Sequence, residues 1–141
     1  MAIFKSDLSK AEKRTYLRVL AYVMKTGKAK AQIQKEYLEI QAKEAGFPLS
    51  ELEKLKPIVS KDELIKELKA ITNIRSRRFI LREIVMLSVT DHEISDAEMA
   101  NIYEVGTKSG IKEEKINDFF LWAAQGIEWQ IEGAKLVEED L

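Results

Sequence analysis

Apolar residues recur along most of the chain at intervals of three and four, the spacing that places them on one face of an α-helix. Alternation of apolar and polar residues, which a half-buried β-strand needs, does not persist beyond a few positions. The pattern predicts helices near residues 9–26, 31–45, 51–56, 61–71, 75–90, 96–109 and 113–134. We therefore expect an all-α protein in which residues 1–141 form a single domain of about seven helices.

Two of these segments are apolar on nearly every side. Tyr16–Met24 and Phe79–Val89 each present too wide an apolar surface for a helix that is half exposed to water. Both should therefore lie at the centre of the domain and pack against each other, with the remaining helices outside them.

The two central segments also belong to an apparent internal repeat with an offset of 64 positions. The markers Leu17, Arg18, Thr26 and Gly46 recur as Leu81, Arg82, Thr90 and Gly110. The pseudo-repeats would cover about 9–56 and 73–120, and two half-domains that each expose an apolar face can bury it against one another. The sequence thus predicts a duplicated bundle whose central helices meet across a pseudo-twofold axis.

The ends of the predicted helices carry local signals. Four Ser-x-x-Glu sequences match the capping box that begins a helix. They are Ser9/Glu12, Ser50/Glu53, Ser60/Glu63 and Ser95/Glu98. Gly46 and Gly110 stand where a left-handed residue would end a helix. Pro48 and Pro57 interrupt the chain on either side of the short third helix.

Composition narrows the class of protein. With 45% apolar and 33% charged residues the chain is globular, and the lack of cysteine excludes disulfides, thiol nucleophiles and thiolate metal sites. No signal peptide or membrane-spanning run is recognisable, so we expect a cytoplasmic protein. Residues 1–70 carry 15 Lys/Arg against 10 Asp/Glu, whereas residues 71–141 carry 8 against 14. Either the two halves attract each other as they dock, or each offers a charged face to a partner.

The run LREIVMLSVTDHEISDAEMANIYEVGTKSGI, residues 81–111, resembles the TerB-like (tellurite-resistance) helical family. The positions that match the family pattern are Asp91, Glu93, Ile94, Ser95, Glu98, Gly110 and Ile111. The resemblance implies a duplicated all-helical domain associated with stress responses and with no settled enzymatic activity. Two features depart from the family: His92 replaces its turn glycine, and Lys28 and Lys30 replace the acidic turn in the first repeat.

The acidic turn of the second repeat is a candidate metal site. Asp91 and Glu93 would be its first ligands, with Asp96 and Glu98 nearby, and a hard divalent cation prefers such carboxylate oxygens. The favoured interpretation is structural, because acidic residues stabilise a helix amino terminus and Glu98 can complete a capping box. His92, the only histidine, is expected to end a helix in a turn with positive φ rather than to bind zinc.

Four arginines cluster at the start of the second central helix: Arg75, Arg77, Arg78 and Arg82. They could form a solvated face that pairs with nearby glutamates, or an anion site centred on Arg75 and Arg78. Nucleic acid is not an expected partner, because the domain is slightly acidic and no aromatic residues are interleaved with a basic stripe.

The last predicted helix carries two apolar faces. One should join the core and contains Ile116, Phe120, Ala123, Ile127 and Ala134. The other, which we call the seam, alternates large and small residues at spacings of three and four: Phe119, Trp122, Gly126, Trp129, Gly133 and Leu136. We expect the seam to be buried within the domain, with a homodimer or partner interface as the alternative. Residues 137–141 should be frayed.

No catalytic constellation is recognisable in the sequence. We therefore expect a non-enzymatic interaction or stress-response module that binds a protein partner or associates with itself through Phe119, Trp122, Trp129 and Leu136. It would require no cofactor and would not span a membrane, although its partner could be membrane-bound. The alternative is a metal-responsive protein that binds a weak divalent cation at Asp91 and Glu93.

Overall fold

The computed structural model describes residues 4–27, 30–91 and 94–139. Over these ranges it contains seven α-helices, a short 3₁₀-helix at Lys5–Asp7 (η1) and no strand. The α-helices are α1 (Lys10–Thr26), α2 (Ala31–Ala45), α3 (Leu49–Leu52), α4 (Lys61–Lys69), α5 (Ile74–Asp91), α6 (Asp96–Lys108) and α7 (Glu113–Glu138). The predicted all-α fold of about seven helices is confirmed.

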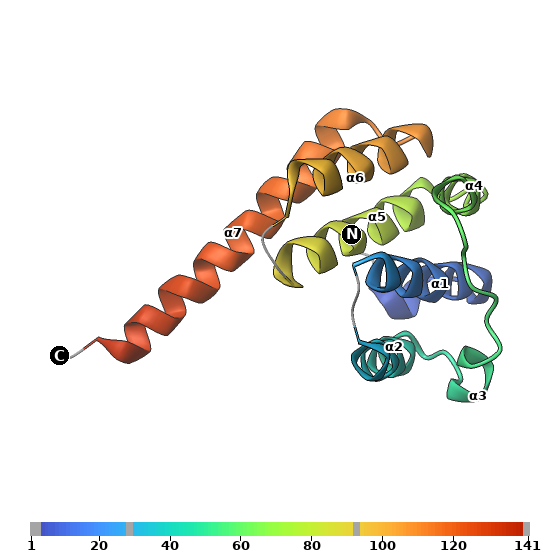
Figure 1. The fold of residues 1–141 in the computed structure, drawn as a ribbon, viewed down its shortest axis with the longest axis horizontal. Coiled ribbons are helices and arrows are strands. Elements are labelled where there is room, and N and C mark those ends of the chain that lie inside the picture. Colours follow the sequence, from blue (N-terminus) through green and yellow to red (C-terminus); the bar gives the residue numbers. More distant parts are fainter. Residues whose placement is uncertain (1–3, 28–29, 92–93, 140–141) are drawn as a thin grey trace.

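Helices α1 and α5 pack side by side in the middle of the bundle, as their apolar surfaces predicted (Figure 1). Leu17 and Leu20 from α1 and Leu81 and Val85 from α5 are fully buried. Burying each such side chain stabilises the fold by about 1.5–3 kcal/mol. Two positions paired by the apparent repeat, Leu17 and Leu81, therefore both lie in the core, while the duplication itself stays a prediction.

The other helices cover this central pair in layers (Figure 1). Helix α2 packs on α1, whereas α6 and α7 pack on α5, and α4 bridges α1 and α6 at one end. The α1–α5 contact includes Tyr16, whose ring centroid lies 5.7 Å from that of Phe79. The buried Tyr16 hydroxyl donates to Gln41 Oε1 at 3.0 Å, which satisfies the one polar atom of this side chain.

The capping signals are mostly confirmed. Ser9 caps α1 and forms a complete box with Glu12, and Ser60 and Ser95 accept from the amides of Glu63 and Glu98. Gly46 and Gly110 have the predicted positive φ, at 73° and 92°.

The third helix differs from its prediction over 51–56. Pro48 precedes α3, and its carbonyl accepts from the amides of Glu51 and Leu52, so the helix begins at Leu49 and ends at Leu52. Ser50 therefore lies inside α3, and its proposed capping box with Glu53 is wrong. Pro48 is the N-cap, and its carbonyl makes the first hydrogen bonds of the helix.

Candidate interaction surface

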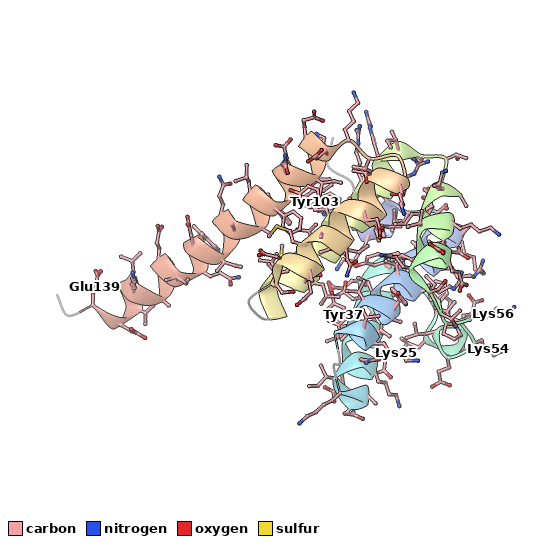
Figure 2. The ribbon with its side chains drawn as sticks, turned by 45° about the horizontal axis from the view of Figure 1, so that its top comes forward. Lys25, Tyr37, Lys54, Lys56, Tyr103 and Glu139 are labelled. Atoms are coloured by element: carbon pink, nitrogen blue, oxygen red, sulfur yellow. The ribbon has the colours of Figure 1, made fainter. Side chains whose placement is uncertain are left out.

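Helix α7 divides into a packed part and a projecting part. Near its start, Ile116 and Ala123 are fully buried, and Phe119 and Phe120 are half-buried against the core. From Ala124 to Glu138 every residue except the half-buried Ile127 is exposed. We call residues 124–138 the α7 arm, which extends away from the bundle in Figures 1 and 2, with Glu139 just beyond its tip.

The seam runs from the packed part of α7 onto the arm. Trp122 is 41% exposed, Trp129 75% and Leu136 70%. A methyl group added at Gly126 or Gly133 would meet no atom within 4 Å. The prediction that the seam is buried within the domain is therefore wrong for every seam residue except the half-buried Phe119.

The seam is uncovered because no neighbouring helix is long enough to follow it. Helix α7 has 26 residues, whereas α5 has 18 and α6 has 13. For the same reason Ala134, assigned by sequence to the core face, is exposed. Val137 and Glu138, expected in the frayed tail, are the last two helical residues.

Other apolar residues on α7 are also exposed, and the sequence did not predict their exposure. Leu121, Ile131 and Val137 are all exposed. By helical spacing Val137 adjoins the seam, whereas Ile131 lies on the opposite side of the helix. Periodicity alone could not find them, because it assigns each apolar residue to a face without showing which faces are covered. Together with the seam they make the arm apolar over much of its circumference.

Trp122 is anchored by a cation from the central helix. The guanidinium carbon of Arg82 lies 5.0 Å from the ring centroid of Phe79 and 5.2 Å from that of Trp122. A cation over an aromatic face is attracted by the ring quadrupole, so Arg82 fixes the base of the seam against α5. Arg82 also lies near Glu83, with Nε 3.6 Å from its carboxylate.

The remaining arginines of the predicted cluster have separate roles. Arg77 donates to the carbonyls of Ile71 and Ser109, at 2.5–3.1 Å, and so ties the start of α5 to the end of α6. Arg75 is exposed, and Arg78 is half-buried with its Nε lacking a hydrogen-bond partner among the described residues. The anion site at Arg75 and Arg78 stays a prediction.

The acidic turn lies largely beyond what the structure describes. Glu93 and His92 are outside the described residues, and so is the side chain of Asp91, whose backbone ends α5. Over the described ranges, no group of three or more His, Cys, Asp or Glu residues could hold a metal ion. The cation site at Asp91 and Glu93 stays a prediction.

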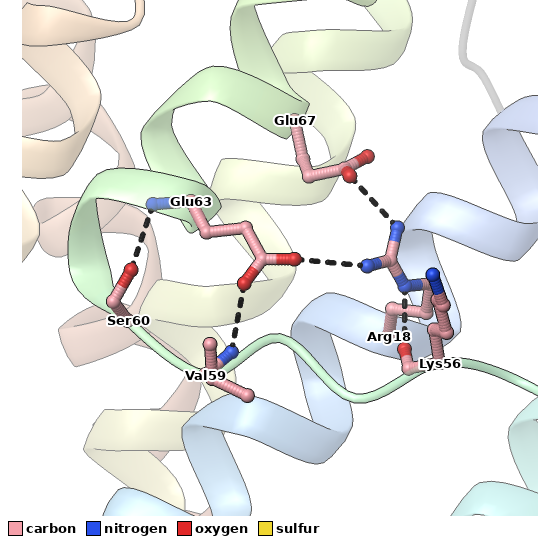
Figure 3. Close-up of polar contacts among 6 residues, drawn as sticks. All are labelled: Arg18, Lys56, Val59, Ser60, Glu63 and Glu67. Atoms are coloured by element: carbon pink, nitrogen blue, oxygen red, sulfur yellow. Dashed lines mark hydrogen bonds and ion pairs between the residues drawn. The ribbon is translucent and has the colours of Figure 1, made fainter.

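A surface hollow of about 550 Å³ lies over α1 and α4, with Arg18, Glu63 and Glu67 in its lining. Arg18 donates to the Lys56 carbonyl at 2.6 Å and pairs with Glu63 at 3.3 Å and Glu67 at 2.9 Å (Figure 3). Because these charges are paired with one another, the arrangement serves as a structural link between α1 and α4.

Several side chains of the bundle have shifted pKa values. Burial raises the pKa of the Tyr16 and Tyr103 hydroxyls. The hydrogen bonds of Lys61 and Lys108 lower the pKa of Glu104, and Glu104 raises that of Lys61. These groups lie on α1, α4 and α6, away from the arm.

No protein-family model, curated protein or solved structure matches the chain. Among the described helices, none combines the length and apolar character needed to cross a membrane. The candidate site is therefore defined by geometry, and its most prominent feature is the exposed arm.

Proposed function

We propose that this chain is a non-enzymatic protein-interaction module that contacts its partner through the α7 arm. The observation that carries the proposal is the exposure of Trp129, Leu136 and Val137 on a helix that leaves the bundle. Contiguous exposed apolar surface of this kind marks interaction sites in soluble proteins. Tryptophan in particular concentrates binding energy at interfaces.

The helical arm suits recognition of another protein. A helix that presents an apolar face can pack into a groove or against a second helix, which is a common mode of peptide and protein recognition. Because the arm continues from the well-packed start of α7, its helix needs no separate nucleation. The arm thus offers its apolar side chains on a preformed support, which lowers the entropy lost on binding.

The charge of the arm favours a protein over other partners. Residues 124–139 contain four glutamates and one lysine. Helices that lie on membranes are usually rich in Lys and Arg on the polar face, and nucleic acids bind cationic surfaces. An acidic helix with exposed tryptophan fits neither pattern. The stress-response role implied by the TerB-like resemblance and the cytoplasmic location expected from the sequence belong to this proposal.

Site-specific photo-crosslinking tests the proposal. A photoreactive phenylalanine analogue is placed at Trp129 in the full chain, or at the exposed Lys54 on the bundle as the matched control. We expect covalent protein adducts from position 129 in cells that express the chain, and a clear reduction when Leu136→Glu is added. Equal yields at the two positions, or no adduct at 129, would overturn the proposal.

A further inference from the structure

We infer that the partner of the arm is a second copy of this chain, and that the two α7 helices pair in antiparallel orientation. This inference rests on the proposed function and specifies what covers the seam. It follows from the order of large and small residues along the seam and from the open space at two glycines.

The seam is self-complementary in only one orientation. Its large residues Trp122, Trp129 and Leu136 occupy one heptad position, and Gly126 and Gly133 occupy the other. In a parallel pair, equivalent positions meet, so tryptophan would oppose tryptophan and glycine would oppose glycine. Such a pair would alternate overfilled layers with voids, and protein interiors tolerate neither.

An antiparallel pair brings the two sets of positions together. Centred between Ile127 and Glu128, it places Trp129 opposite Gly126 of the second copy and Trp122 opposite its Gly133. Leu136 then meets the second copy's Phe119, which is half-buried and still accessible. Every layer thus contains one large residue facing a glycine, or two apolar side chains.

The two glycines have the space that this packing requires. Nothing lies within 4 Å of the position where a side chain at Gly126 or Gly133 would begin. Glycine inside a helix costs about 1 kcal/mol relative to alanine. Two glycines on one exposed face therefore suit a helix that is approached closely by an aromatic ring of the second copy. The indole of tryptophan is large enough to fill the space beside each glycine.

The area of the seam matches a modest but specific dimer. The exposed parts of the four tryptophans in a pair would bury on the order of 600 Å². That is half of the ~1,200 Å² found in the smallest stable interfaces. Leu136, Val137 and the apposed backbones supply further area, so we expect dissociation in the micromolar range.

Sedimentation equilibrium over a concentration series tests the dimer. We expect Gly133→Leu to weaken association at least tenfold, because the added side chain occupies the space for Trp122 of the second copy. Ala124→Leu is the control: it also places a leucine on the arm, but on the side opposite the seam, and should change association less than about twofold.

Two outcomes would overturn the inference. One is a chain that stays monomeric at millimolar concentration, and the other is a dimer that Gly133→Leu does not weaken. If the chain is monomeric while Trp129 still crosslinks to another protein, the second copy is excluded and the proposed function stands. If position 129 gives no adduct at all, the proposed function fails as well.

Spin-label distances test the orientation. The chain lacks cysteine, so single labels can be attached at Glu128→Cys or Lys135→Cys, two positions on the same side of the arm. With a rise of about 1.5 Å per residue, the antiparallel pair gives axial offsets of about 2 Å for the first label and about 22 Å for the second. A parallel pair gives no offset at either position, so equal distances for the two labels would overturn the antiparallel arrangement.

Discussion

Gly106 shows how one residue fixes the approach of three helices. It lies in α6, and a Cβ at this position would be 2.5 Å from Ile116 Cδ1 on α7 and 2.9 Å from Leu81 Cδ2 on α5. Both neighbours are fully buried in a close-packed interior. Glycine is therefore required here by packing rather than by backbone conformation.

Gly106→Ala is expected to destabilise the protein by up to about 2 kcal/mol. Overpacking a core typically costs ~1–3 kcal/mol, and this outweighs the ~1 kcal/mol that alanine gains in helix propensity. Urea denaturation of both proteins measures the difference.

Gly133→Ala, measured at a protein concentration low enough for the chain to be monomeric, is the control, because it adds the same methyl group where no atom of the chain lies within 4 Å. It should not lower the free energy of unfolding. A Gly106→Ala protein as stable as the wild type would show that the three helices can separate slightly without loss.

Among the elements, α4 and α1 share a polar link through Arg18, beside their buried apolar contacts. Arg18 is only 13% exposed and reaches the Lys56 carbonyl, Glu63 and Glu67 at once. Glu63 also accepts from the amide of Val59, so its carboxylate serves both the start of α4 and the link to α1. Glu63 therefore contributes both to the start of α4 and to the packing of α4 on α1.

Arg18→Met should lower the free energy of unfolding by about 1.5–3 kcal/mol. The substitution keeps the apolar stem and removes hydrogen bonds to charged groups in a poorly hydrated position. Chemical denaturation at constant pH measures the loss.

Lys10→Met provides the comparison, because the Lys10–Glu51 pair is well exposed at both ends. Its removal should change stability by less than about 0.5 kcal/mol. Similar losses from the two substitutions would mean that burial adds nothing to the Arg18 link.

At the scale of the whole molecule, an ion pair links the first half of the sequence to the second. Lys61 on α4 pairs with Glu104 on α6, and Lys108 on α6 contacts the same carboxylate at 3.2 Å. The hydrogen bonds of the two lysines lower the pKa of Glu104. A group whose pKa is lowered by folding binds its proton more weakly in the folded state, so folding becomes less favourable as that proton is added.

The stabilisation from Glu104 should therefore be complete above its unfolded pKa and be lost as the pH falls through its lowered folded pKa. A carboxyl-carbon NMR titration should show this folded pKa below the ordinary glutamate value. Unfolding measured along the same acid range should reveal a smaller pH dependence in Glu104→Gln. A titration at or above the ordinary value would show that the ion pair does not persist in solution.

Much of the fold could be predicted from the sequence because its signals are local. The serines that cap α1, α4 and α6, and the positive-φ glycines at 46 and 110, act within one helical turn. The nearly all-round apolar character of α1 and α5 likewise predicted their central position. Where the prediction failed, at α3, a proline two residues before Ser50 set the helix start instead.

The seam marks the limit of what the sequence by itself determined. Spacing showed that Trp122, Trp129 and Leu136 share a face of one helix, because that depends only on helical periodicity. Whether anything covers that face depends on the lengths and directions of other helices, and periodicity gives no information about these. Only the tertiary structure decided that α7 runs beyond α5 and α6 and leaves Trp129 and Leu136 in solvent.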